Sequence, residues 1–207
     1  MTEITFVIPS IGRKTLIDSL QSLISQDDPD WFAIVIFDGV PHDSIRNIVI
    51  EDKRITYLHI RNKIGISNHA GDVRNIGINN VKTEWCGFLD DDDRIVSNYV
   101  SLFRDTIGKH TDAEVVQWRM IGEQDLCIPD KSGEIRTCNI GISQSIKTSV
   151  LLEHPFEPSY YEDFALLDKL NKCKKKIIIS DKVTYLVRNA EYRCSNFEAR
   201  FYNFEQS

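Results

Sequence analysis

The sequence lacks the features that mark secreted, membrane-spanning or disulfide-stabilised proteins. No apolar run approaches the roughly 20 residues that a helix needs to cross a bilayer, and the first residues lack the basic and apolar stretches of a signal peptide. The five cysteines are widely spaced and include no CxxC pair, which favours reduced thiols over a zinc site or a disulfide framework. These absences predict a cytoplasmic protein with no transmembrane segment.

Positive charge is also scarce. The formal net charge is −6 and no basic face is evident, which argues against a protein whose main partner is nucleic acid. The one basic run consists of Lys172 and the lysines at 174–176. Such a short run is typical of a solvated helix end, with peripheral contact to a membrane surface as the alternative.

The residues that are present have the composition of an ordinary globular protein. Of the 207 residues, 42% are hydrophobic and 27% are charged, which is enough apolar material for one core. The sequence contains no internal repeat, low-complexity segment or linker. We therefore expect a single domain over residues 1–207.

The first half of the chain alternates between short apolar runs and helical periodicity. The run at 32–37 is almost unbroken, as in a strand that is buried on both faces of a parallel sheet. The pattern predicts strands at 4–8, 32–37, 55–60 and 85–89, and helices at 16–24 and 68–81. This alternation predicts an α/β fold with a doubly wound, mostly parallel central sheet flanked by helices.

The second half is less regular. It predicts strands at 115–120, 138–143, 177–179 and 183–187, helices at 145–152 and from 160 onwards, a polar excursion at 123–133 and a helical tail from 195. In doubly wound sheets, ligands bind beyond the carboxyl ends of the strands. Three predicted strands of the first half end in polar groups, at Pro9-Ser10, at Asp38 and at the acidic run 90–93.

The acidic run 90–93 consists of four consecutive aspartates directly after an apolar strand. Folding alone gives no reason to gather four carboxylates that repel one another, whereas a bound Mg²⁺ or Mn²⁺ prefers such oxygen ligands. In an extended segment, Asp90 and Asp92 point the same way and can approach one metal ion together. The alternative is an acidic turn that caps the following helix.

Four segments resemble motifs of glycosyltransferase family 2, whose members share the GT-A fold. The segment 88–93, Phe-Leu-Asp-Asp-Asp-Asp, is similar to the Asp-x-Asp motif of that family. Residues 7–13 resemble its opening strand and proline-containing loop, 74–78 its Arg-Asn-x-Gly element, and 162–166 its Glu-Asp motif. The motifs follow the order of the family and span residues 4 to about 170.

The resemblance implies a nucleotide-sugar donor, preferably UDP-linked, bound by the half 1–93. It implies that Asp92, helped by Asp90, binds Mn²⁺ or Mg²⁺ as the cofactor that holds the diphosphate. It also implies a set of donor-binding side chains, namely Pro9, Arg13, Asp38, Arg74 and Asp91. Relatives place a late His or Arg at the metal or diphosphate, and Arg188 or Arg193 can supply a bidentate donor of this kind.

The half 94–207 is expected to face the acceptor, which the resemblance implies is a glycan or another hydroxyl compound. It implies that Asp163 is the catalytic base of an inverting reaction. A hydroxyl is a poor nucleophile, and a carboxylate within reach can accept its proton. The start of a helix favours the charge of Glu162 and Asp163, which keeps a base ionised. The alternative is that both are ordinary first-turn acids that complement the helix dipole. Neighbouring acceptor-side candidates are Tyr160, Tyr161 and Glu162.

Three other functions compete with a metal-dependent glycosyltransferase. A nucleotidyltransferase of similar architecture also holds nucleoside phosphates with metal-bound acids, but it usually carries a glycine-rich basic loop, of which residues 10–14 are a thin version. A phosphatase-like magnesium enzyme needs an Asp-x-Asp at the first strand, which here ends in Pro9-Ser10. A non-catalytic carbohydrate- or cation-binding module explains the acidic run but not the Glu-Asp helix start.

Overall fold

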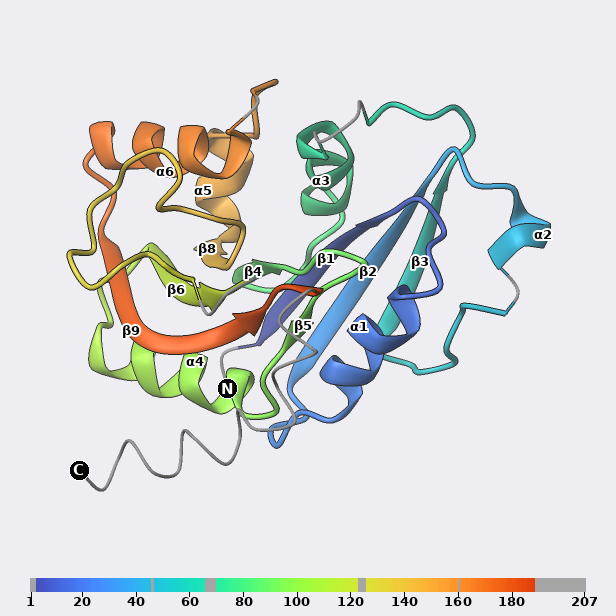
Figure 1. Ribbon diagram of the computed structural model, residues 1–207, viewed down its shortest axis with the longest axis horizontal. Helices are drawn as coiled ribbons and strands as arrows, with labels where there is room; N and C mark the ends of the chain where they lie inside the picture. Colours follow the sequence, from blue (N-terminus) through green and yellow to red (C-terminus); the bar gives the residue numbers. More distant parts are fainter. Residues whose placement is uncertain (1–2, 46, 66–69, 123–125, 160, 189–207) are drawn as a thin grey trace.

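The computed structural model describes residues 3–45, 47–65, 70–122, 126–159 and 161–188. One curled sheet runs through both halves of the chain, with helices on its two faces (Figure 1). Its strand order is β3-β2-β1-β4-β8-β6-β9-β5, with β7 paired to β6. The expected α/β fold in a single domain is confirmed. The predicted helical tail from 195 lies outside the described residues.

The N-terminal half forms the parallel part of the sheet, because its strands are joined by helical crossovers. Ile4 of β1 aligns with Trp31 of β2 on one side and with Trp85 of β4 on the other. The strands are β1 (Ile4–Ser10), β2 (Trp31–Asp38), β3 (Ile55–Ile60) and β4 (Trp85–Phe88), and the helices are α1 (Leu16–Ile24), α2 (His42–Ile45) and α3 (Gly71–Ile78). Every residue of β1 and β4 is buried, as the near-continuous apolar runs require.

The C-terminal half extends the sheet in mixed directions. Strand β8 runs antiparallel to both β4 and β6, and β9 runs parallel to β6. The strands are β5 (Arg94–Ile95), β6 (Val115–Ile121), β7 (Cys127–Ile128), β8 (Gln144–Lys147) and β9 (Ile177–Leu186), and the helices are α4 (Tyr99–Lys109), α5 (Thr148–Glu153) and α6 (Glu162–Lys172). The short β5 pairs with the end of β9, so the segment after the acidic run forms the last strand at this edge of the sheet.

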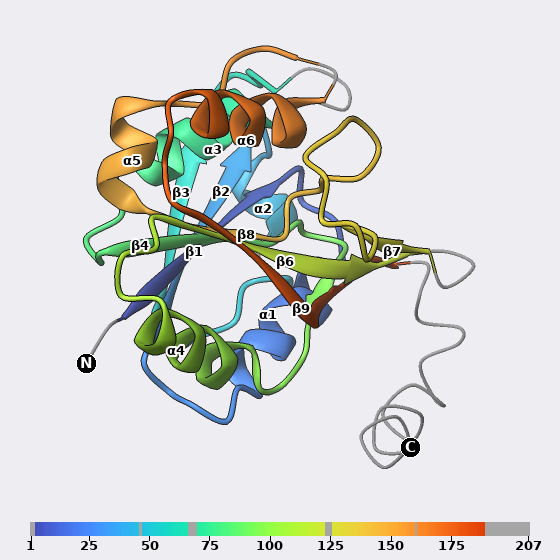
Figure 2. The ribbon, with the colours of Figure 1, turned by 90° about the vertical axis from the view of Figure 1, so that its left-hand side faces the viewer.

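Helices cover both faces of the sheet. Helices α3, α5 and α6 lie on one face and α1 and α4 on the other, as both ribbon views show (Figures 1 and 2). Helix α3 packs closely because Gly77 faces the sheet: a Cβ on this residue would come within 2.5 Å of Val7 Cγ1 and 2.8 Å of Ile36 Cδ1. This packing brings the start of α3 to the carboxyl end of the parallel strands.

The irregular second half differs from the sequence prediction in three places. The strand expected at 138–143 is β8 at 144–147, and the helix expected from 145 begins at 148. The strands expected at 177–179 and 183–187 belong to the single strand β9: its pairing with β6 shifts register between Ile179 and Val183, around the exposed residues 181–182, and then resumes. Among the described residues, no helix is long and apolar enough to span a bilayer.

Candidate functional site

The acidic run forms a turn at the carboxyl end of β4. The backbone N–H of Asp93 donates to the Asp90 carbonyl at 3.2 Å, which closes the turn. Two side chains anchor it: Tyr185 Oη accepts a hydrogen bond from the Asp90 N–H at 3.1 Å, and Ser19 Oγ donates to the Asp90 carbonyl at 3.2 Å. The run is therefore a turn and not the expected extended segment. The joint approach of Asp90 and Asp92 to one cation stays a prediction.

Two carboxylates of the turn face the loop that follows β1. Asp91 is buried and accepts hydrogen bonds from Ser10 Oγ at 2.7 Å and from Arg13 Nη1 at 2.8 Å. Burial raises the pKa of Asp91, while its bonds with Ser10 and Arg13 act in the opposite direction. The same Arg13 nitrogen lies 3.1 Å from Asp92 Oδ2, and Arg188 Nη1 lies 3.8 Å from that oxygen. The predicted residues Arg13, Asp91, Asp92 and Arg188 thus come together.

Asp90 contacts α3. Arg74 Nη2 donates to Asp90 Oδ1 at 2.6 Å, and Arg74 Nη1 donates to Glu162 Oε1. The Arg74 side chain is only 4% exposed. Burial disfavours its charged form, but Asp90, Asp163 and Glu162 outweigh this effect and raise the pKa of Arg74. A buried guanidinium therefore joins the acidic turn to the Glu-Asp pair at the start of α6.

Asp163 stands in the first turn of α6, beside this ion-pair network. Its Oδ1 is shielded from solvent and has no hydrogen-bond partner among the described residues. Burial raises the pKa of Asp163 to about 7; Asp90 and Glu162 add to the rise, and Arg74 opposes it. Burial and the two neighbouring acids thus act against the ionised form that the helix start was expected to favour.

Three contacts at the site, which involve Asp93 and Gln144, were not predicted from the sequence. Asp93 is buried, accepts the backbone N–H of Arg188 at 2.8 Å and is hydrogen-bonded to Tyr185. Burial raises its pKa to about 7. Gln144 Nε2 donates to the Asp163 carbonyl at 3.2 Å and ties α6 to β8. The fourth acid of the run was the available signal for Asp93, whereas nothing in the sequence distinguishes Tyr185 or Gln144 from ordinary strand residues.

Asp38, at the end of β2, holds a neighbouring loop. Its two carboxylate oxygens accept the backbone N–H groups of Ile64 and Gly65, both at 2.8 Å, and the residue is 3% exposed. Pro9 is buried in β1, beside β2. Both residues lie at the carboxyl edge of the sheet, as expected, and their contact with a nucleoside stays a prediction.

The acceptor-side candidates occupy different environments. Tyr161 is 55% exposed, next to the base candidate, whereas Glu162 is 8% exposed and bonded to Arg74 and to the start of α3. Burial and these bonds hold the Glu162 carboxylate inside the protein, and a contact of either residue with an acceptor stays a prediction. Tyr160 and Arg193 lie outside the described residues.

The acidic turn has ligand chemistry that suits a hard cation. The side chains of Asp90 and Asp92 are 32% and 27% exposed and offer carboxylate oxygens. Within the part of the chain that the structure describes, no three His, Cys, Asp or Glu residues form a ready-made metal cluster. Mg²⁺ sites in nucleotide-dependent enzymes use one or two carboxylates and complete the shell with phosphates and water. Two carboxylates of this exposure fit a cation of that kind.

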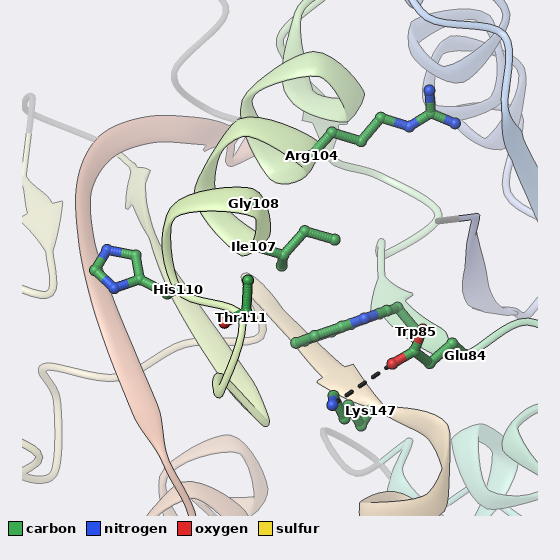
Figure 3. A pocket seen from close by; sticks show the side chains of 8 residues that line it. All are labelled: Glu84, Trp85, Arg104, Ile107, Gly108, His110, Thr111 and Lys147. Carbon is green, nitrogen blue, oxygen red and sulfur yellow. Dashed lines mark ion pairs between the residues drawn. The ribbon is translucent and has the colours of Figure 1, made fainter. Parts of the chain in front are cut away.

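A separate cavity of about 360 Å³ lies at the opposite end of β4. Trp85 and Lys147, which are neighbours on the paired strands β4 and β8, both line it. Lys147 Nζ is paired to Glu84 and lies 5.8 Å from the Trp85 ring centroid, while the His110 ring points away (Figure 3). No described candidate site residue lines this cavity. It is therefore distinct from the site at the acidic turn.

Solved structures share the fold. A crystal structure of S. aureus TarS 1–349 in complex with UDP-GlcNAc matches 90% of this chain and 58% of that chain, with a TM-score of 0.70 and 19% identity. A mannosyltransferase from Pyrobaculum calidifontis in complex with GDP-Man and Mn²⁺ matches 89% of this chain and 56% of that chain, with a TM-score of 0.68 and 13% identity. At these identities the likeness establishes a GT-A architecture.

Curated relatives match about half of the chain. A GalNAc(5)-diNAcBac-PP-undecaprenol beta-1,3-glucosyltransferase of Campylobacter jejuni is 29% identical over 106 residues, which cover 49% of this chain and 33% of the relative. An uncharacterized glycosyltransferase of Rickettsia bellii is 32% identical over 103 residues, which cover 48% of this chain and 14% of the relative. The matched region is thus one third or less of these longer proteins.

The model of the family described as Glycosyl transferase family 2 matches residues 5–155. This range includes the loop after β1, Arg74 and the whole acidic turn, and it ends before the Glu-Asp pair of α6. Because the match covers most of the chain and agrees with the GT-A architecture, the chain belongs to glycosyltransferase family 2.

Proposed function

We propose that this chain transfers a sugar from a nucleoside-diphosphate donor to an acceptor hydroxyl, with inversion at the anomeric carbon. One observation carries the proposal: the acidic turn and Asp163 lie on either side of the buried Arg74, which is bonded to Asp90. A donor-binding edge and a shielded carboxyl group are the two parts that direct displacement at an anomeric carbon requires. Family membership favours this reaction over nucleotidyl transfer or a non-catalytic binding module.

The donor binds at the carboxyl edge of the parallel strands. Asp90 and Asp92 would hold a divalent cation, Mn²⁺ or Mg²⁺, which would supply positive charge next to the donor diphosphate. Arg13 and Arg188, which lie next to Asp92, orient phosphate oxygens as bidentate donors. A UDP-linked donor is the preferred choice. The complexes of TarS with UDP-GlcNAc and of the mannosyltransferase with GDP-Man and Mn²⁺ support a nucleotide-sugar and a metal in this architecture.

Asp163 accepts the proton of the acceptor hydroxyl as its oxygen attacks the anomeric carbon. Its Oδ1 has no hydrogen-bond partner among the residues that the structure describes, so no protein donor competes with an acceptor hydroxyl for this shielded oxygen. A base is most effective when its pKa lies near the working pH, and burial places the pKa of Asp163 at about 7. Tyr161, exposed at the start of α6, offers a ring on which an acceptor sugar stacks.

Two substitutions test the two halves of this proposal. Asp92→Ala removes a cation ligand and should abolish metal-dependent nucleotide binding, measured by titration calorimetry. Asp163→Asn should leave nucleotide binding intact and lower turnover by about 10²- to 10⁴-fold, which is the usual contribution of a general base. Hydrolysis of nucleotide-sugars provides the turnover assay, because water can replace an unidentified acceptor.

Asp168→Asn is the matched control, since it makes the same change on α6 at an acid that pairs with Lys172 away from the site. This control should keep both nucleotide binding and turnover. Near-normal turnover of Asp163→Asn would show that another group accepts the proton. Loss of nucleotide binding in the Asp168 control would show that the assay reports the integrity of α6 and not the chemistry of the site.

A further inference from the structure

We propose that Glu162 is a positioning residue of the transfer reaction, which holds the base helix α6 and the acidic turn in a fixed relation through Arg74. The inference rests on the proposed function for its catalytic meaning. It replaces the expectation that Glu162 contacts the acceptor. Three observations support this inference. They are the contacts of the Glu162 carboxylate, the close approach of Gly71, and the continuation of the ion-pair chain to Asp90.

Both carboxylate oxygens of Glu162 are occupied by groups of α3. Oε2 accepts the backbone N–H of Gly71 at 2.8 Å, and Oε1 accepts the backbone N–H of Ala70 at 3.2 Å together with Arg74 Nη1. With 8% of the residue exposed, this carboxylate is saturated inside the protein. An acceptor hydroxyl therefore has no access to it.

Glu162 acts as the N-terminal cap of α3 although it lies about 90 positions later in the chain. Ala70, the residue at the N-cap position of α3, has no side-chain hydrogen bond that caps the helix. The first N–H groups of a helix need acceptors, and a carboxylate at this end also complements the helix dipole. Gly71 makes the approach possible, since a Cβ there would lie 2.8 Å from Glu162 Oε2. The helix start and the acid are therefore shaped for each other.

The chain of charges continues from Glu162 to the donor side. Arg74 binds Glu162 with one guanidinium nitrogen and Asp90 Oδ1 with the other, at 2.6 Å. A planar guanidinium with two fixed partners has little freedom, so Glu162 determines how Arg74 meets the acidic turn. Residues that orient a metal ligand typically change metal affinity or activity by about 10- to 100-fold when they are removed.

The fold does not depend on this carboxylate alone. Asn75 on α3 holds the segment before α6 with two further hydrogen bonds: its Nδ2 donates to the Phe156 carbonyl at 3.0 Å, and its Oδ1 accepts the Phe156 N–H at 3.0 Å. The substitution Glu162→Gln keeps the side-chain volume and one acceptor oxygen. We therefore expect this variant to fold with α3 and α6 in place, with an uncharged partner for Arg74 and with an amide NH2 facing one of the donors that the carboxylate accepted.

The charge of Glu162 also acts on the base. The charged groups that face Asp163 are Arg74 from α3, Asp90 from the acidic turn and Glu162 from its own helix. Glu162 is one of the groups that raise the pKa of Asp163, so its neutralisation lowers that pKa. The acid limb of the pH profile should move to lower pH in Glu162→Gln, which a purely structural role does not predict.

The test compares Glu162→Gln and Glu162→Asp with the wild-type protein. Glu157→Gln serves as the matched control, because this exposed acid pairs with Lys169 away from the site. Amide hydrogen exchange of Ala70 and Gly71 in the ligand-free protein reports the cap directly. Metal-dependent nucleotide binding and nucleotide-sugar hydrolysis without acceptor report the donor side, and the pH profile of hydrolysis reports the base.

Glu162→Gln should speed exchange at Ala70 and Gly71, weaken metal-dependent nucleotide binding, lower hydrolysis by about 10- to 100-fold and shift the acid limb of the profile downwards. Glu162→Asp keeps the charge and should restore the position of that limb. Unchanged exchange and unchanged hydrolysis in Glu162→Gln would overturn the inference, as would a loss confined to the acceptor KM. If wild-type protein binds no nucleotide, the proposed function fails, and hydrogen exchange alone then decides whether Glu162 caps α3.

Discussion

Removing the charge of Asp163 should stabilise the protein, and the gain should depend on pH. Folding raises the pKa of Asp163 from the ordinary aspartate value of about 3.9 to about 7, mainly through burial. Between these two values the folded protein holds a proton that the unfolded chain releases, so wild-type stability falls as pH rises towards 7. Above about pH 7 both states are deprotonated and the full penalty is present. Asp163→Asn removes this penalty.

The size of the effect follows from the shift. Each pKa unit corresponds to about 1.4 kcal/mol, so a rise of about three units sets an upper limit on the order of 4 kcal/mol. Two effects reduce it: Arg74 loses an attractive neighbour, and the new amide needs hydrogen-bond partners at a cost of about 1–2 kcal/mol. A net gain of about 2 kcal/mol at pH 8 remains, which corresponds to a Tm increase of about 4–8 °C for a domain of this size.

Urea unfolding at pH 5, 6, 7 and 8 measures this gain. The difference in the free energy of unfolding between Asp163→Asn and wild type should grow between pH 5 and pH 7 and level off above. Asp168→Asn, which alters a side chain in an i,i+4 ion pair with Lys172, should change stability by at most about 0.5 kcal/mol. A difference for Asp163→Asn that is independent of pH, or that has the opposite sign at pH 8, would refute the reasoning about its burial.

Three further outcomes are expected. Turnover of the wild-type protein should fall about tenfold per pH unit below pH 7, because Asp163 must be deprotonated to act as the base; a rate that stays flat down to pH 5 would contradict this role. Gly77→Ala should lower the free energy of unfolding by about 1–3 kcal/mol in urea titrations, because the added Cβ collides with Val7 and Ile36, whereas Gly108→Ala, with open space at this position, should not. Tyr185→Phe should weaken metal-dependent nucleotide binding in calorimetry, because the acidic turn loses the hydroxyl that accepts the Asp90 N–H; unchanged affinity would exclude this anchoring role.

The parallel half of the fold could be predicted because burial and sequence pattern coincide there. The run at 32–37 is apolar on both faces, and the structure buries nearly all of β2 between β1 and β3. In β9 the two signals separate, since exposed residues at 181–182 interrupt the pattern, while the strand resumes its pairing with β6 after a register shift at this point. Local hydrophobicity describes side chains, whereas a strand is defined by its backbone partners.

The candidate site was predictable as a set of residues and not as a set of contacts. The acidic run and Arg74 belong to motifs of the same family, so the sequence led us to expect both at one site. The turn conformation of the run depends on Tyr185, 95 positions after Asp90, and the burial of Glu162 depends on a glycine at the start of α3. Such long-range contacts leave no local pattern, and they decide which acids face the donor and which hold the structure.

Nucleotide binding with and without a divalent cation tests the proposed transfer function most directly. Thermal shifts with UDP, GDP, TDP and CDP, each with Mn²⁺ and with EDTA, report binding because a ligand of the native state raises its apparent stability. We predict that one nucleotide, preferably UDP, raises the Tm in the presence of Mn²⁺. This shift should disappear with EDTA and in Asp92→Ala. A folded protein whose Tm is unchanged by all four nucleotides would contradict a metal-dependent nucleotide-sugar site at the acidic turn.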